Sequence, residues 1–133
     1  MLVFGASGYI GTNLVPRLVA EGWTVRAAAR NPRVLEARHW PVEHVAADAL
    51  QPETLPGALA GIDIAYYLVH SMASGRNFGR LDLQAADNFA QATAAAGVKR
   101  IVYLGGLVPR DADSEHLVSR KETGDRLRAG PVP

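Results

Sequence analysis

The stretch GASGYIG, residues 5–11, places three glycines at three-residue intervals between an apolar run and a helical pattern. The apolar run is LVF, residues 2–4. The segment 9–21 that follows has apolar residues at every fourth position, which is the spacing of one helix face. This order predicts a strand, a tight turn and a helix. Because glycine has no side chain, a phosphate group can approach the backbone of such a turn and meet the N–H groups at the helix N-terminus.

The three glycines have separate predicted roles. Gly5 makes the turn, Gly8 permits the close approach of a pyrophosphate, and Gly11 lets the helix pack against the sheet. The spacing is GxxGxxG rather than the better-known GxGxxG, so the prediction depends on the strand before it and the helix after it. The alternative is a turn with a purely structural role. The cofactor-binding residues predicted in this segment are Gly5, Ser7, Gly8, Tyr9, Ile10 and Gly11.

Strand-like and helical segments alternate along the rest of the chain. Because parallel strands need long crossover connections, this order predicts an α/β fold, with a doubly wound parallel sheet of about five strands and helices on both faces. Ligands bind such sheets beyond the carboxyl ends of the strands, here between the first and the fourth strand. The strands are expected at 2–4, 24–29, 42–47, 62–69 and 99–105, and the helices at 9–21, 53–60, 79–96 and 114–129, the last with Ser114 as its N-cap and Gly130 as its C-cap.

Composition and charge exclude several classes of partner. The 14 basic and 13 acidic residues leave no net field that would attract nucleic acid or a membrane surface. There is no cysteine, and the four histidines lack metal-ligand spacing, so we expect no metal site. No apolar run reaches the roughly 18 residues of a membrane span. These features favour a cytoplasmic protein whose partner is a small molecule.

The length of 133 residues fits one domain, residues 1–133. The closing residues GPVP, 130–133, read as a connection into a further strand. We therefore expect the chain to be the N-terminal part of a longer architecture, truncated before a substrate-binding part that is absent here.

Several motifs beyond the glycine loop point to one family. They are ARNP at 29–32, Asp48 after the third strand, YYLVHSM at 66–72, YLGGL at 103–107 and HLVSR at 116–120. Together with the glycine loop they resemble the atypical and extended branch of the short-chain dehydrogenase/reductase superfamily. Within that branch they are most similar to NmrA-like and NAD(P)H-binding proteins, some of which carry an epimerase label. The resemblance implies an NAD(P)-binding Rossmann fold.

The end of the second strand favours one dinucleotide over the other. An acidic residue there would accept hydrogen bonds from the adenosine ribose and repel a 2′-phosphate, whereas an arginine would pair with that phosphate. The chain has Arg30 at this place and no acidic residue from 24 to 35. NADP is therefore expected rather than NAD, with Arg26 and Arg33 as further candidates for the phosphate. The alternative is that Arg30 is a solvated loop charge.

The resemblance also assigns roles at the ends of the third and fourth strands. It implies that Asp48 accepts a hydrogen bond from the adenine amino group and that Ala49 lines the ring. It further implies that Val69, His70 and Ser71 contact the ribose or pyrophosphate half of the cofactor. The alternatives are a turn or helix cap for Asp48 and a packed or surface histidine for His70.

The catalytic residues of the superfamily are a tyrosine, a lysine four residues later and a serine at the end of the fifth strand. In this chain the glycines of YLGGL stand where that serine is expected, and no YxxxK follows the fifth strand. His116 and Arg120 have the four-residue spacing in the last helix, and imidazole titrates near neutrality. They are the predicted catalytic pair. The alternative is that both are ordinary polar residues on an exposed helix face.

Two functions stay open from the sequence. One is an NADP-dependent oxidoreductase or epimerase-like enzyme with an unknown small-molecule substrate. The other is a non-catalytic dinucleotide-binding module, such as a redox sensor or an assembly factor. A homodimer through the helix 79–96 and the last helix is also predicted, because the alanine run at 91–96 allows close helix approach. Core packing within one chain explains the same alanines.

Overall fold

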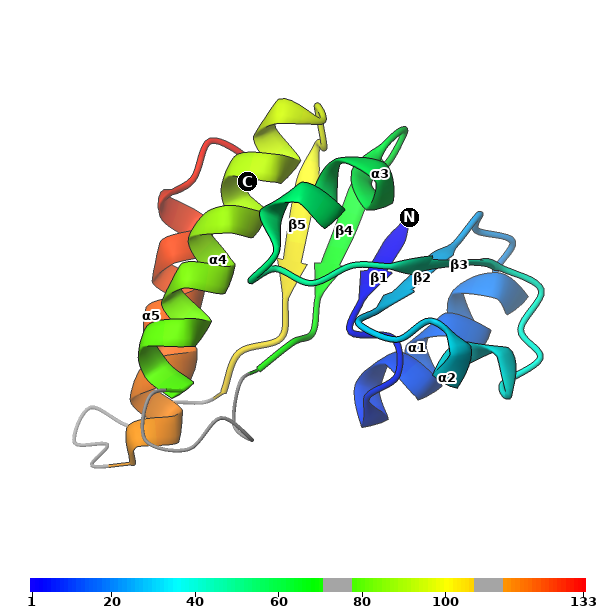
Figure 1. Ribbon diagram of the computed structural model, residues 1–133, viewed down its shortest axis with the longest axis horizontal. Helices are drawn as coiled ribbons and strands as arrows, with labels where there is room; N and C mark the ends of the chain where they lie inside the picture. Colours follow the sequence, from blue (N-terminus) through cyan, green and yellow to red (C-terminus); the bar gives the residue numbers. More distant parts are fainter. Residues whose placement is uncertain (71–77, 107–113) are drawn as a thin grey trace.

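The computed structural model describes residues 1–70, 78–106 and 114–133. Within them, five parallel strands form one sheet in the order β3-β2-β1-β4-β5, with helices on both faces (Figure 1). The predicted doubly wound parallel sheet is confirmed. The strands are β1 (Leu2–Phe4), β2 (Arg26–Ala29), β3 (Glu43–Ala46), β4 (Ile64–Tyr67) and β5 (Arg100–Tyr103), and the helices are α1 (Tyr9–Ala20), α2 (Arg33–Glu36), the 3-10 turn η1 (Pro52–Thr54), α3 (Leu55–Leu59), α4 (Phe78–Ala95) and α5 (Glu115–Ala129).

The strand order explains which helices cover which face. The chain builds β1, β2 and β3 in one direction, then returns to place β4 on the other side of β1 and continues to β5. Because crossovers between parallel strands are right-handed, the reversal moves the later helices to the opposite face. Figure 1 shows α1 and α2 on one side of the sheet and α3 and α4 on the other, with α5 beside α4. The carboxyl ends of β1 and β4 therefore meet at the switch point, as predicted.

Alternation along the strands gives two apolar cores. In β1, Val3 belongs to the core under α1 and α2, whereas Leu2 and Phe4 belong to the core under α3, α4 and α5. Phe4, Tyr67 and Phe89 form a ring cluster in the second core, with centroids 4.8–5.8 Å apart. Burying each ring stabilises the fold by about 1.5–3 kcal/mol. The cluster holds the ends of β1 and β4 together directly beneath the switch point.

The observed elements differ from the predicted ones mainly at their ends. The predicted strand 62–69 leaves the ladder after Tyr67, although the Leu68 N–H still donates to the Phe4 carbonyl at 2.9 Å. The predicted helix 53–60 divides into η1 and α3, and the one-turn helix α2 was not predicted because four residues show no helical period. The last helix begins and ends as predicted, but the Ser114 side chain donates and accepts no capping hydrogen bond in the described residues.

The alanine run of α4 contributes to the core of this chain. Ala92 and Ala94 pack against the second core, while Gln91, Ala95 and Ala96 are exposed. A homodimer through this helix stays a prediction. None of the helices in the described residues has the length and apolarity that crossing a bilayer requires.

Candidate functional site

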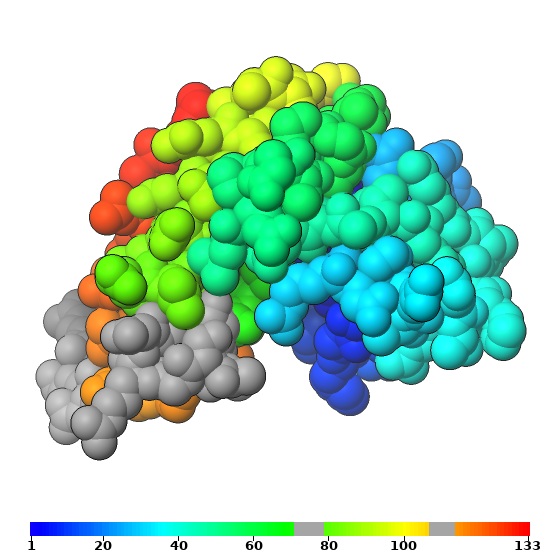
Figure 2. All heavy atoms as spheres, in the orientation of Figure 1, coloured from blue at the N-terminus to red at the C-terminus, as the bar shows by residue number. Residues whose placement is uncertain are grey.

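A cleft of about 210 Å³ opens at the carboxyl edge of the sheet, at the switch point. In Figure 2 the outline is indented at the lower edge, between the blue atoms of the N-terminal segment and the green atoms. Tyr9, Ile10 and Gly11 lie in the first turn of α1, outside this lining, and Ser71 lies outside the described residues. The predicted cofactor-binding residues that do line the cleft are Gly5, Ser7, Gly8, Arg30, Asp48, Ala49, Val69 and His70.

The glycine loop is tightly bound to the neighbouring strand. Gly5 has a φ of +94°, and the N–H groups of Gly5 and Ala6 both donate to the Ala28 carbonyl at 3.0 Å. A Cβ atom at Gly5 would lie 2.9 Å from Val69 Cγ1 and 3.0 Å from the Leu68 carbonyl. Both the backbone conformation and the lack of space therefore require glycine where β1 turns into the loop.

The N-terminus of α1 is open to the cleft. Gly8 is its N-cap in an extended conformation, and the helical ladder begins with the Thr12 N–H donating to the Gly8 carbonyl at 2.9 Å. No side chain of the described residues caps Gly8. The N–H groups of residues 9–11 precede the ladder, so this end of the helix presents donors and a partial positive charge to an anion.

Asp48 shapes the turn after β3. Its Oδ1 accepts from the Leu50 N–H at 2.9 Å, and its own N–H donates to Thr54 Oγ1 at 2.9 Å. Asp48 is thus a turn residue, as the alternative interpretation held, and it also lines the cleft. The hydrogen bond from Leu50 uses only one of the two carboxylate oxygens of Asp48, Oδ1; the second oxygen takes no part in this bond.

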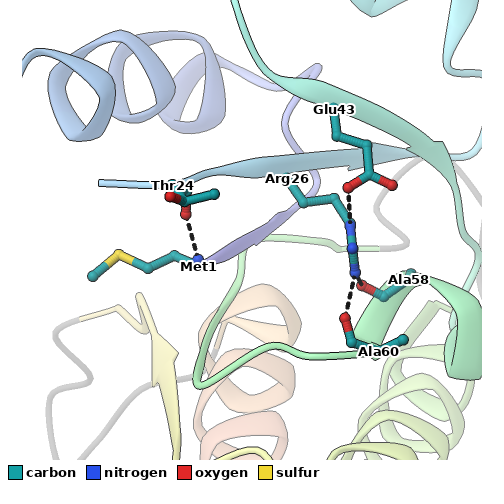
Figure 3. A network of polar contacts seen from close by, with 6 residues as sticks. All are labelled: Met1, Thr24, Arg26, Glu43, Ala58 and Ala60. Atoms are coloured by element: carbon teal, nitrogen blue, oxygen red, sulfur yellow. Dashed lines mark hydrogen bonds and ion pairs between the residues drawn. The ribbon is translucent and has the colours of Figure 1, made fainter. Parts of the chain in front are cut away.

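Arg26 and Arg30 lie at opposite ends of strand β2, Arg26 at the amino edge of the sheet and Arg30 at the carboxyl edge. Arg30 follows the last residue of β2 and is exposed at the cleft. Arg26 is the first residue of β2, and its guanidinium donates to Glu43 at 2.7 Å and to the carbonyls of Ala58 and Ala60, each at 2.8 Å (Figure 3). The prediction that Arg26 assists at the phosphate is therefore wrong. Arg26 lies at the amino end of β2, whereas the cleft lies at the carboxyl edge of the sheet. Arg33 is exposed in α2 and does not line the cleft.

His70 is the titratable ring at the β4 side of the cleft. It is half-buried, and its ring packs edge-on against Tyr103 with a centroid distance of 6.3 Å. Burial lowers the pKa of His70 below its usual value of 6.5, the positive charge of Arg120 lowers that pKa further, and the carboxylate of Asp82 opposes both effects. The imidazole is therefore neutral at neutral pH and can accept a proton.

The tyrosines behind the cleft are poorly suited to proton exchange. Burial raises the pKa of Tyr67 far above its usual value. Burial also raises the pKa of Tyr103, whose hydroxyl donates to the Arg120 carbonyl at 3.0 Å. A general acid or base works best with a pKa near the operating pH. Neither of these tyrosines meets that condition.

The predicted catalytic pair lies in two different environments. His116 is exposed in the first turn of α5, outside the lining of the cleft. Arg120 is half-buried one turn later, and its Cδ would lie 3.6 Å from a Cβ atom on Gly106. Arg120 is thus the member of the pair that lies near the end of β5 and influences His70.

Asp82 is a residue of the cleft that the sequence analysis missed. It is 5 % exposed, lines the cleft from α4, and accepts a hydrogen bond from Ser119 Oγ at 2.9 Å. A signal for it exists in the sequence, because Asp82 continues the buried helical stripe of Ala85, Ala86 and Phe89. A carboxylate on a core-facing stripe is unusual and marks a position with a polar partner.

Residues 5–129, from the glycine loop to the end of α5, match the family described as NAD(P)H-binding. The chain belongs to this family. The predicted resemblance to NAD(P)H-binding proteins and the prediction of an NAD(P)-binding Rossmann fold are confirmed. The contacts of single NAD(P)H-site residues with the cofactor stay predictions.

Similar proteins include both reductases and an assembly factor. The (4-alkanoyl-5-oxo-2,5-dihydrofuran-3-yl)methyl phosphate reductase of Streptomyces griseus is 30% identical over 100% of this chain and 44% of its own length. Photosystem II assembly factor Ycf39 of Guillardia theta is 31% identical over 91% of this chain and 39% of its own. The Citrobacter sp. triphenylmethane reductase, solved with NADP(H), superposes with a TM-score of 0.81 and 25% identity over 96% of this chain and 44% of that chain. This NAD(P)H-binding chain therefore spans less than half the length of these relatives.

Proposed function

We propose that the chain binds NADP(H) across the switch point of the sheet. In this proposal the pyrophosphate lies at Gly8 and the N-terminus of α1, the adenosine end extends toward Arg30 and Asp48, and the nicotinamide end extends toward His70. The supporting observation is that one cleft brings the glycine loop, Arg30, Asp48 and His70 together from four separate segments. When bound, the cofactor supplies or accepts a hydride.

The predicted contacts of the other site residues belong to the same proposal. The N–H groups of Tyr9, Ile10 and Gly11 face the pyrophosphate together with the Ser7 hydroxyl, because they precede the helical ladder. Ala49 lines the adenine ring, and Val69 contacts the ribose or pyrophosphate half of the cofactor. The same contact is proposed for Ser71, which lies outside the described residues. The alternative, a structural turn, explains Gly5 and Gly11 but gives no reason for the open N-terminus of α1 at Gly8.

For the whole protein we propose an NADP-dependent oxidoreductase or an epimerase-like enzyme. The similarity to two reductases supports this proposal. Two candidates exist for the group that exchanges a proton with the substrate. One is the predicted pair of His116 and Arg120, and the other is His70. The cleft favours His70, because its imidazole lines the cavity and is neutral at neutral pH. Arg120 also contributes when His70 is the acid–base group, since its charge lowers the pKa of His70.

A non-catalytic role is the second candidate. Its support is that Tyr67 and Tyr103 are both held protonated and that one relative is an assembly factor. This role predicts that bound NADPH stays reduced when carbonyl or quinone acceptors are supplied to the longer protein, whereas an enzyme would oxidise it. Loss of NADPH fluorescence with time distinguishes the two functions.

The choice between NADP and NAD is tested at Arg30. We expect calorimetric titration to show binding of NADPH, and Arg30→Ala to weaken that binding about tenfold or more. The reason is that a hydrogen bond to a charged group contributes about 1.5–3 kcal/mol. The affinity for NADH, which lacks the 2′-phosphate, should not fall in the variant.

Arg17→Ala is the matched control, since Arg17 is also exposed but pairs with Glu21 on α1 and does not line the cleft. It should leave both affinities unchanged. If wild-type protein binds NADPH and NADH equally and Arg30→Ala changes neither, the preference for NADP is wrong. If wild-type protein binds neither dinucleotide, the proposed function is wrong.

A further inference from the structure

Asn88 connects helix α4 to the turn that lines one wall of the cleft. Its Nδ2 donates to the Ala49 carbonyl at 2.7 Å, a bond between residues 39 apart in the sequence. Ala49 is 3 % exposed and lines the cleft. A carbonyl in such a buried turn needs a hydrogen-bond partner, and the side chain of Asn88 supplies it.

The same turn carries the Asp48 carboxylate. Its Oδ1 accepts from the Leu50 N–H at 2.9 Å, and Thr54 Oγ1 accepts from the Asp48 N–H at 2.9 Å. Ala49 lies between Asp48 and Leu50, the two residues that this bond joins. The Ala49 carbonyl and the Leu50 N–H belong to the same peptide group, so the direction of the carbonyl determines where the N–H points. The orientation of the carboxylate therefore depends on the bond from Asn88.

We propose that Asn88 is a positioning residue for base recognition: by holding the Ala49 carbonyl it orients the second carboxylate oxygen of Asp48 toward an exocyclic amino group of the bound base. This inference rests on the proposed function, in which the adenosine end lies beside Asp48. It goes beyond that function because it assigns the preference for adenine to a side chain on α4. Asn88 itself does not line the cleft.

The chemistry of the base provides a readout that a merely structural role would not change. Hypoxanthine has a carbonyl oxygen in place of the amino group of adenine, so a carboxylate oxygen would face an acceptor rather than a donor. A hydrogen bond to an ionised group is lost in that case. The ratio of the affinities for the two bases therefore measures the orientation of Asp48 and is insensitive to a general loss of affinity.

The experiment titrates the whole chain with NADPH and with the reduced hypoxanthine analogue of NADPH. We expect wild-type protein to prefer NADPH about tenfold. Asn88→Ala should reduce this preference to about threefold or less. Asn88→Asp, which keeps the size of the side chain but loses the donor, should reduce it similarly, so that the test survives if one variant fails to fold.

Thr93→Val is the matched control on the same helix. The Thr93 hydroxyl is buried and lies 2.9 Å from the carbonyls of Phe89 and Ala90, away from the cleft. Thr93→Val should lower stability without changing the preference for adenine. An unchanged preference in Asn88→Ala and Asn88→Asp, or a wild-type protein without any preference, would overturn the inference while NADPH binding itself stands. Failure of wild-type protein to bind either dinucleotide would instead count against the proposed function.

Discussion

Gly8 and Gly11 lie less than one turn apart, yet an added methyl group would meet very different surroundings. At Gly11 a Cβ atom would lie 2.5 Å from Ala6 Cα and 2.7 Å from two carbonyl oxygens. At Gly8 the nearest atom would be the Gly5 carbonyl oxygen at 3.4 Å, an ordinary contact. Gly11 is therefore required by the fold, because α1 packs on the loop backbone. The absence of a side chain at Gly8 keeps the cleft accessible at the helix N-terminus.

At the residue scale, His70 predicts a dependence of stability on pH. Its pKa is lowered in the folded protein, so the unfolded chain binds the proton more readily and acid favours unfolding. The free energy of unfolding should decrease as the pH falls through about 6.5, and this loss should be complete below the lowered pKa. Urea denaturation between about pH 8 and pH 5 measures it.

His70→Gln removes this titration. The stability advantage of wild-type protein over His70→Gln should therefore shrink as the pH falls. In His116→Gln, which keeps His70, the decline should persist. A difference between wild-type protein and His70→Gln that stays constant over this pH range would contradict the assignment.

At the element scale, Arg26 joins three elements at the amino edge of the sheet. Its side chain extends from β2, pairs with Glu43 of β3, and donates to two carbonyls at the C-terminal end of α3 (Figure 3). The Arg26 side chain is 19% exposed, so water screens this pair less than an ordinary surface pair. The contact holds α3 against the sheet on the side away from the cleft.

Arg26→Met should reduce the free energy of unfolding by about 1–3 kcal/mol, because the carbonyls of Ala58 and Ala60 lose their donor. Lys99→Met, which breaks the exposed pair with Asp63, should lower the free energy of unfolding by less than Arg26→Met does, because water screens that pair. Urea denaturation measures both changes. The affinity for NADPH should be the same in both variants as in wild-type protein, and a selective loss of NADPH binding in Arg26→Met would contradict the placement of the site.

At the scale of the whole molecule, the features predicted correctly from the sequence are those that depend on neighbours along the chain. The glycine loop and the periodic segments specify the strands, the helices and the switch point, because crossover handedness leaves few arrangements. Arg26 was wrongly assigned to the phosphate. Whether a residue lies at the amino or the carboxyl edge of the sheet depends on where its strand begins. The bond from Asn88 to Ala49 and the contact of Asp82 with Ser119 join distant segments, so no local pattern indicates them.

In the proposed function, the open N-terminus of α1 at Gly8 receives the pyrophosphate of NADP(H). The most direct measurement is the dissociation constant of NADPH for Gly8→Val, compared with wild-type protein. Valine is compatible with the extended backbone at Gly8, and Gly57→Ala on α3, where nothing lies within 4 Å, is the control. We predict a folded Gly8→Val protein whose NADPH affinity is at least about a hundredfold weaker, because the added side chain blocks the donors. A folded Gly8→Val protein that binds NADPH as tightly as wild-type protein would show that the pyrophosphate does not lie at this helix N-terminus.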